Sequence, residues 1–473
     1  MEVQWWSMIP FIVMLLSIAI LPLIHATEHR WEQNSTKLTL ALILGIPVAV
    51  WFWFAGEHTT VLHSLWEYVQ FVLLLGSLFI VSGGIFLTGD LRATPRTNAT
   101  FLGVGAVLAS FIGTTGAAML LVRPLLNTNK ERLHKVHTIV FLIFIVANTG
   151  GLLTPLGDPP LFLGFLRGVP FTWTFNLLPE WLFVNAMLLA TYFALDTRLY
   201  RKEPGSALLS DAIQRTPLGV KGKIHFLFLA LVVVAVALIP SLDLHAIETG
   251  EATLTQMIPW RELVFVLAGA GSYFLGDKVA RFVSNEFSWT PILEVAALFI
   301  GIFLTMMPAL KFLSQIAPKL PLNELTFFAF TGGLSAVLDN APTYVTFFEM
   351  ARQLPGEPRV ADVPEVYLVS ISLGAVFMGA MTYIGNGPNF MTKAVADSRG
   401  VAMPSFGGYV VWSGRDLLPI LIAMALIFIA PQLWLKIIGI LLAVLILARA
   451  ALVLRSTREA EVVEERPLDE ATV

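Results

Sequence analysis

TPLGDPPLF, residues 154–162, and TYIGNGPNF, residues 382–390, share the pattern T-x-[LI]-G-[DN]-x-P-x-F, and each follows a long apolar run. Glycine weakens a helix and proline removes a backbone donor, so both stretches predict an interrupted helix. Inside a bilayer, the freed backbone groups are tolerated only where they are buried in protein or line a water-filled cavity. If the apolar runs cross a membrane, the two stretches therefore predict a shared polar chamber.

The composition indicates a membrane protein. Of the 473 residues, 56% are hydrophobic and 13% are charged, whereas soluble proteins carry about 25% charged residues. Cysteine is absent, which excludes disulfides and thiolate chemistry. We therefore predict an all-α polytopic membrane protein surrounded by membrane lipids. The expected crossings lie near residues 8–24, 38–54, 69–87, 138–153, 174–195, 224–240, 262–276, 292–308, 366–383, 408–430 and 433–454.

The distribution of charge predicts the orientation in the membrane. Segment 196–223 is rich in Lys and Arg, so we expect it in the cytoplasm, and segment 241–259 has acidic residues without Lys or Arg, so we expect it outside. Counting the crossings outward from these segments predicts an external N-terminus and a cytoplasmic C-terminus. The short loops are typical of a multi-pass protein of the cell (inner) membrane.

Two further segments, 99–126 and 327–350, are apolar but polar in the middle. Basic residues flank the first segment on both sides, which favours a re-entrant hairpin over a full crossing. Each segment precedes one interrupted helix, and Thr114-Thr115 in the first is matched by Asp339-Asn340 in the second. The chain therefore consists of two similar halves.

If the hairpins do not cross, each half crosses the membrane five times, and an odd number of crossings inverts the second half relative to the first. Inverted repeats with interrupted helices are typical of secondary transporters. We predict a first inverted repeat at 1–195, a cytoplasmic linker at 196–223, a second inverted repeat at 224–430, a C-terminal transmembrane helix at 431–458 and a disordered cytoplasmic tail at 459–473.

Polar side chains at the hairpin tips and around the interruptions are the candidate binding residues. A carboxylate at membrane depth is costly and indicates an ion or proton path, so Asp158 and Asp339 carry the most weight. We predict that substrate or ion contacts Thr114, Thr115, Asn148, Thr149, Thr154, Asp158, Asp339, Asn340, Thr343, Thr382, Asn386 and Asn389, with a Na⁺ site at Asp158, Asp339 and Asn340.

A structural role is the alternative for several of these residues. Asp158 precedes Pro159 and could cap the helix after the first interruption. Asp339 or Asn340 could cap the second helix of its hairpin, with Pro342 in the first turn. The capping alternative weighs more for Asn340 than for Asp339, because an acid at membrane depth is the more costly residue.

Helix-to-helix hydrogen bonding is the alternative for Asn148 and Thr149, which precede the first interruption, and for Asn389 after the second. Arg123 lies in the first hairpin and could bind an anionic substrate. We expect it instead to extend its guanidinium to the cytoplasmic surface.

The motifs resemble those of the ion transporter superfamily, which includes NhaD-type sodium/proton antiporters and citrate transporters. The resemblance rests on ANTGGLLTPLGDPP (147–160) and SAVLDNAP (335–342). It implies a transport domain built from both hairpins and both broken helices, beside a scaffold domain that often forms a homodimer. GTTGAA (113–118) stands where an antiporter could carry a second acidic pair, so Asp158 would have to supply the second charge.

Sodium/proton antiport is the function that we predict, with Asp339 and Asp158 alternately binding Na⁺ and H⁺. The alternative is a cation-coupled transporter of citrate or another carboxylate, whose anion would face the hairpin helix N-termini. No metal cluster, nucleotide loop or nucleophile–base pair indicates an enzyme. We expect no cofactor, since Na⁺ and H⁺ are substrates, and no nucleic-acid partner.

Overall fold

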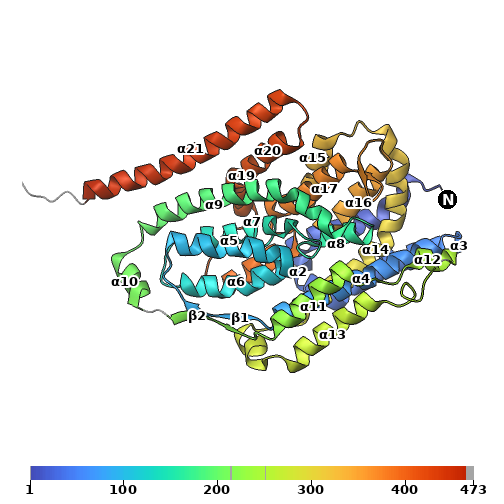
Figure 1. Ribbon diagram of the computed structural model, residues 1–473, viewed down its shortest axis with the longest axis horizontal. Coiled ribbons are helices and arrows are strands. Elements are labelled where there is room, and N and C mark those ends of the chain that lie inside the picture. The colour runs from blue at the N-terminus through green and yellow to red at the C-terminus, as the bar shows by residue number, and fades with distance from the viewer. Residues whose placement is uncertain (1, 214–215, 251, 465–473) are drawn as a thin grey trace, which may run out of the picture.

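The computed structural model describes residues 2–213, 216–250 and 252–464, and helices dominate it (Figure 1). Within these residues, six helical stretches are long and apolar enough to cross a membrane: Asn34–Phe54, His58–Ser82, Phe171–Tyr200, Thr290–Lys319, Phe406–Ile429 and Leu433–Ser456. Shorter apolar helices cover Trp5–Ile20, Val136–Leu152, His225–Leu238 and Glu365–Met381. The predicted all-α polytopic membrane fold is confirmed.

The first half runs through η1 (Trp5–Met8), α1 (Ile9–Ile20), η2 (Leu21–Leu23), α2 (His25–Trp31), α3 (Asn34–Phe54), α4 (His58–Ser82), β1 (Phe86–Asp90), α5 (Pro95–Ile112), α6 (Thr114–Thr128), α7 (Val136–Ile145), η3 (Thr149–Leu152), α8 (Pro159–Leu166), η4 (Phe171–Leu177) and α9 (Leu178–Tyr200). The linker contains α10 (Gly205–Ile213) and β2 (Thr216–Lys221).

The second half runs through α11 (His225–Leu238), α12 (Leu244–Thr249), α13 (Trp260–Leu275), η5 (Val279–Ser284), α14 (Thr290–Ile316), η6 (Ala317–Lys319), α15 (Glu324–Ser335), α16 (Asn340–Arg352), β3 (Arg359–Val360), β4 (Val363–Pro364), α17 (Glu365–Met378), η7 (Gly379–Met381), α18 (Gly387–Ser398), α19 (Phe406–Asp416), α20 (Leu418–Met424) and η8 (Ala425–Ile429). Helix α21 (Leu433–Glu464) follows.

Both predicted hairpins consist of two helices packed against each other, α5 with α6 and α15 with α16. The first turns at Gly113, whose positive φ of 81° suits glycine, and the second at Asp339. Gly113 and Asp339 are the N-cap residues of the two second helices. The structure therefore aligns Gly113 with Asp339, one position away from the sequence match, which aligned Thr114 with Asp339.

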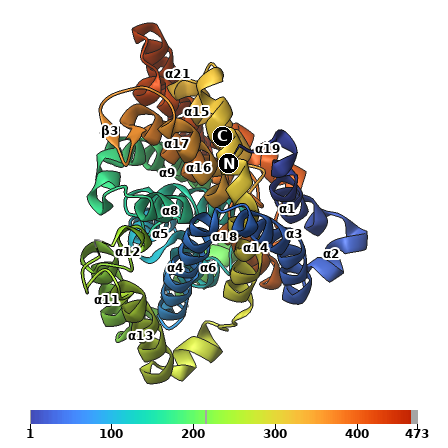
Figure 2. The ribbon, with the colours of Figure 1, turned by 90° about the vertical axis from the view of Figure 1, so that its right-hand side faces the viewer.

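Packing contacts recur between the halves. Helix α3 packs on α14 as α13 packs on α4, and α6 packs on α18 as α16 packs on α8. In Figure 2, α11 and α13 lie at one edge and α1–α3 at another, with α6, α8, α16 and α18 between them. In Figure 1 the α5–α6 hairpin lies toward the left and the α15–α16 hairpin toward the right. A two-fold relation between the halves would produce this reciprocity; the inverted orientation and the domain boundaries stay predictions.

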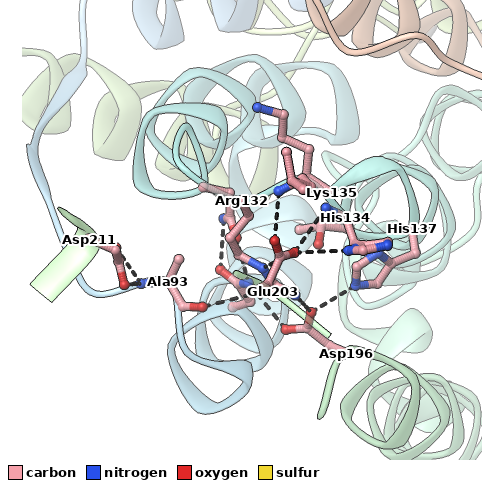
Figure 3. Close-up of polar contacts among 12 residues, drawn as sticks. Ala93, Arg132, His134, Lys135, His137, Asp196, Glu203 and Asp211 are labelled. Carbon is pink, nitrogen blue, oxygen red and sulfur yellow. Dashed lines mark hydrogen bonds and ion pairs between the residues drawn. The ribbon is translucent and has the colours of Figure 1, made fainter. Parts of the chain in front are cut away.

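The linker is folded onto the first half. Strand β2 pairs antiparallel with β1, with Lys221 opposite Phe86. The carboxylate of Asp211 in α10 accepts the backbone N–H of Ala93 at 3.1 Å (Figure 3). This end of the molecule is therefore fixed by pairing between segments far apart in the sequence.

A buried polar cluster holds the same end together (Figure 3). The carboxylate of Asp196 lies 2.6 Å from the guanidinium of Arg132 and 2.8 Å from His137 Nε2. Glu203, just beyond α9, accepts the backbone N–H of His134 at 2.9 Å. Burial opposes ionisation of Glu203, but backbone hydrogen bonds and Arg132 keep the pKa of its carboxyl below the ordinary value.

The C-terminal helix begins where the expected last crossing, 433–454, begins, and it extends beyond the expected end. Helix α21 continues to Glu464, so residues 459–464 of the predicted tail are helical, and residues 465–473 lie outside the described residues.

Candidate functional site

Both interruptions fold the backbone against itself. In the first, between α7 and α8, a Cβ on Gly157 would lie 2.1 Å from the carbonyl oxygen of Gly151. In the second, between α17 and α18, a Cβ on Gly385 would lie 2.5 Å from the carbonyl oxygen of Gly379. Only glycine permits this approach, so the repeated glycine spacing specifies the same fold twice.

A threonine ties each interruption to the neighbouring hairpin. Thr154 Oγ1 donates to the carbonyl of Ser110, near the end of α5, and Thr382 Oγ1 donates at 2.5 Å to the carbonyl of Ala336, just after α15. The same hydroxyls accept the N–H groups of Leu156 at 3.1 Å and of Ile384 at 3.2 Å. Both hydroxyls are thus engaged by backbone groups within the protein.

Asp158 lies where both hairpins and both interruptions meet. Its Oδ1 accepts from Thr114 Oγ1 at 3.1 Å and from Asn386 Nδ2 at 3.2 Å, and its Oδ2 accepts from Asn340 Nδ2 at 2.6 Å. The residue is 1% exposed. It occupies the N-cap position of α8, with Pro159 in the first turn, yet its side chain makes no capping hydrogen bond. Its carboxylate instead joins three other segments.

A chain of amides holds the second interruption against the first. Asn386 Nδ2 also donates to the carbonyl of Ala147 at 3.1 Å and to Asn148 Oδ1 at 3.2 Å. Asn148 Nδ2 donates in turn to Asn389 Oδ1 at 2.7 Å, and Asn389 Nδ2 donates to the carbonyl of Thr382 at 2.9 Å. These amides are all buried.

Asp339 and Asn340 have different roles at the tip of the second hairpin. Asp339 caps α16, because its Oδ1 accepts the N–H of Ala341 at 3.1 Å. Asn340, the first residue of α16, donates to Asp158, and its own Oδ1 is buried without a partner among the described residues. The capping role expected mainly for Asn340 therefore belongs to Asp339.

A cavity of about 100 Å³ opens beside these residues. The hairpin tips and both interruptions form one side of it, and apolar residues of α4 and α14, among them Phe71, Phe79 and Phe299, form the other. Asp339 is the one charged residue among those that line it. We call this space the central cavity.

The predicted site residues form three groups, according to whether they line the central cavity, bond to residues behind it, or bond elsewhere. Thr114, Thr115, Asp339 and Asn386 line it. Asp158, Asn148, Asn340 and Asn389 form the hydrogen-bonded layer behind it. Thr149, Thr154, Thr343 and Thr382 bond elsewhere: Thr149 to Asn185 at 2.8 Å, Thr343 to the carbonyl of Asp339 at 3.0 Å, and the other two to the hairpins.

Four helices begin at the central cavity, namely α6, α8, α16 and α18. The N-terminus of a helix carries partial positive charge and unpaired N–H groups. The N–H groups of Thr115 and Gly116 have no acceptor among the described residues. The cavity thus combines one carboxylate with several backbone donors.

A second cavity of about 240 Å³ adjoins the first, shares Phe79 and Thr115 with it, and lies toward the linker. We call this second cavity the vestibule. Arg123 is one of its lining residues and lies 3.4 Å from Glu286, while Arg399 lies 3.3 Å from the other oxygen of Glu286. With a side chain only 14% exposed, Arg123 does not extend freely to the surface as expected.

A second, less exposed group of ion pairs lies beyond the opposite end of the central cavity. Arg167, just after α8, lies 2.7 Å from Glu67 of α4 and 3.4 Å from Glu349 of α16, and its side chain is 9% exposed. The ion pairs of the vestibule end therefore share Glu286, whose side chain is 60% exposed, whereas the pairs at the other end are all less exposed and include the shortest contact, 2.7 Å.

Sequence reasoning considered Arg123 but missed its partner Glu286 and the backbone acceptors of the site. Glu286 lies in a loop with no motif, and its pairing with Arg123 and Arg399 joins three distant segments. The carbonyl of Ala147 has no sequence signature. The glycine pairs did leave a signal, because Gly151 and Gly157 recur with the same spacing as Gly379 and Gly385.

The family assignment rests on nearly the whole chain. Residues 1–429 match the model of the family described as "Putative citrate transport", and no curated protein matches the chain. The match includes both hairpins, both interruptions and the central cavity, and it ends before α21. It agrees with the prediction of a transporter. The chain therefore belongs to this citrate transport family and is a multi-pass membrane transporter.

Proposed function

We propose that the protein is a cation/proton antiporter, with Na⁺ as its first expected cation, and that Asp339 binds the ion in the central cavity. The observation that carries this proposal is that Asp339 is the one charged residue lining the cavity. The described residues donate one hydrogen bond to its carboxylate, from the N–H of Ala341, so one oxygen stays open to a ligand. A carboxylate at membrane depth is a functional-site candidate by default.

Asp158 supports the proposal as a second acid. Its three donors are a hydroxyl and two amides, and no cationic side chain pairs with it among the residues that the structure describes. Asp196 is different, because Arg132 lies 2.6 Å away and fixes its charge. A carboxylate with only neutral donors can exchange a proton for a cation without breaking an ion pair. Competition for the same acids couples the two flows.

The ion pairs at the two ends of the cavity support alternating access. Arg167, Glu67 and Glu349 close one end with buried contacts. Glu286, whose side chain is 60% exposed, holds Arg123 and Arg399 at the vestibule end. Exposed pairs of this kind contribute about 0–1 kcal/mol each. We infer that the vestibule is the path by which ions reach the cavity in this conformation.

Cation-coupled carboxylate transport is the second candidate. It is favoured by the four helix N-termini at the cavity and by the family description. A multiply charged anion beside Asp339 would need a bound cation to neutralise that carboxylate. The two candidates therefore differ in whether citrate is required for Na⁺-dependent flux.

Proton flux in everted membrane vesicles, followed with a pH-sensitive dye, tests the proposal. Na⁺ added without citrate is expected to raise the internal pH of acidified vesicles containing the protein. Asp339→Asn is expected to abolish this response. Asp362→Asn is the matched control, because Asp362 is 81% exposed and its positive φ of 60° suits asparagine.

Two other outcomes would contradict the proposal. A response that requires citrate would replace antiport with carboxylate transport. A full response in Asp339→Asn, with protein amount equal to wild type, would remove Asp339 from the mechanism.

A further inference from the structure

A cavity of about 160 Å³ lies away from the central site, between α9, α19, α20 and α21. Three of its lining residues are arginines from three different helices: Arg198 of α9, Arg415 of α19 and Arg449 of α21. Figure 1 shows α21 running along α9 and α20 at the edge of the molecule. Because α21 follows residue 429, the family match does not include one wall of this cavity.

The charges in the cavity do not cancel. Asp416 is its one acidic lining residue, with a side chain 3% exposed. Its Oδ2 lies 2.5 Å from Arg415 Nη2, and its Oδ1 lies 3.7 Å from Arg449 Nη2. The side chain of Arg198 forms no ion pair or hydrogen bond with the residues that the structure describes. Three positive charges against one negative charge leave an excess that an anion can satisfy.

The other walls of the cavity are mainly apolar. They include Ala194 and Leu195 of α9, Pro419 and Ile420 of α20, and Ile446 of α21. A cavity lined by both arginines and aliphatic side chains suits a ligand that is anionic at one end and apolar at the other.

The position along the helices corresponds to the edge of the bilayer. Arg198 is in the last turn of α9, next to the basic linker. Arg449 follows the start of α21 at Leu433 by roughly 24 Å of helix, and the hydrocarbon core is about 30 Å thick. The Arg415 guanidinium stacks over Trp412 at 4.4 Å, and tryptophan is enriched at membrane interfaces. The cavity therefore lies at headgroup level on the linker side.

We propose that this cavity binds the phosphate of an anionic phospholipid. Arg198 and Arg449 donate to the phosphate oxygens, while Arg415 stays with Asp416. Guanidinium groups bind phosphate in two-point contacts, and basic pockets between helices on the cytoplasmic side are suited to such headgroups. One acyl chain lies against the apolar lining residues Leu195 of α9 and Ile446 of α21, so the lipid joins α21 to the rest of the molecule.

Native mass spectrometry of the full-length protein in detergent tests this assignment. The probes are phosphatidylglycerol, phosphatidylcholine with the same acyl chains, and inorganic phosphate. The test variant is Arg198→Gln/Arg449→Gln, which leaves Asp416 paired with Arg415 and therefore preserves the fold. The matched control is Lys202→Gln, an exposed basic residue at the same end of the molecule but outside the cavity.

Wild-type protein and the Lys202→Gln control are expected to retain phosphatidylglycerol in preference to phosphatidylcholine. The double variant is expected to bind phosphatidylglycerol roughly tenfold or more weakly, because each interfacial arginine contributes about one kcal/mol to the attraction of anionic lipid. Phosphatidylglycerol is also expected to raise the unfolding temperature of the wild-type protein, and not that of the double variant.

Equal retention by the double variant and wild type would overturn the proposal. So would an equal loss in Lys202→Gln, which would indicate diffuse surface charge, or equal retention of phosphatidylcholine. Stabilisation by inorganic phosphate alone, equal to that by phosphatidylglycerol, would assign the cavity to free phosphate and not to lipid.

Discussion

The two interruptions, 154–160 and 382–388, have nearly the same backbone and different charge. Gly157 in the first lies against the earlier Gly151, Gly385 in the second lies against the earlier Gly379, and each interruption is tied to a hairpin carbonyl by a threonine. Each ends at an N-cap residue whose side chain does not cap its helix. That residue is Asp158 in the first interruption and Asn386 in the second, and their side chains meet at 3.2 Å.

The surroundings of these two side chains explain the difference. Asp158 faces three donors, from Thr114, Asn340 and Asn386. Asn386 also faces two acceptors, the carbonyl of Ala147 and Asn148 Oδ1. The shared backbone fixes the shape of the site, while hydrogen-bonding partners decide which half carries the charge.

Alanine at the crossing glycines is expected to have the largest effect. Gly157→Ala and Gly385→Ala would each place a Cβ against a backbone carbonyl that cannot move aside, at a cost of about 3 kcal/mol or more. Both variants are expected to lose folded protein to a similar extent, measured as the monodisperse fraction in size-exclusion chromatography. Gly387→Ala is the control, because a methyl group added there would meet open space, with no neighbouring segment within 4 Å. Normal folding of Gly157→Ala would refute the shared glycine crossing.

Exchanging the charge between the halves is expected to abolish transport with a smaller effect on folding. In Asp158→Asn/Asn386→Asp, the carboxylate at position 386 would face the acceptors Ala147 and Asn148. Leaving such polar groups unpaired costs about 1–3 kcal/mol. We expect the exchanged protein to be folded and inactive in the vesicle assay, like Asp158→Asn alone. Activity restored by the exchange would show that the location of the charge is unimportant.

Removing the threonine ties is expected to have the smallest effect. Thr154→Val and Thr382→Val each lose the buried hydrogen bond to a hairpin carbonyl and the N–H bonds that the hydroxyl accepts within the interruption, at about 1 kcal/mol for each bond. The two variants should lower the free energy of unfolding, measured in a denaturant titration, by similar amounts. Thr100→Val is the control, because its hydroxyl is exposed and donates within its own helix to Arg96. A large loss in only one of the two variants would contradict the equivalence of the ties.

Local chemistry made the interruptions predictable. Gly157, Pro159, Gly385 and Pro388 break a helix by removing side chains or donors, whatever surrounds them. Hydropathy located most of the apolar helices for the same reason, because a run of apolar residues is excluded from water by its own composition. The polar tips of the hairpins were identified because polar side chains in an apolar run need partners.

The partners themselves could not be predicted from the sequence. Asp339 and Asn340 are adjacent and both suited to capping, and the position of Asp158 across the site decides that Asn340 reaches over while Asp339 caps. Glu286 pairs with Arg123 and Arg399 because three segments meet at the vestibule.

The sequence by itself therefore determined the membrane class, the helices, their two interruptions and the acids near them, since these follow from hydropathy and backbone chemistry within short windows. Only the tertiary structure decided which acid lines the cavity, which acid is enclosed by hydrogen-bond donors, and which arginines remain without a balancing charge. Those properties depend on distances between residues that are more than a hundred positions apart in the chain, and no short window of sequence contains them.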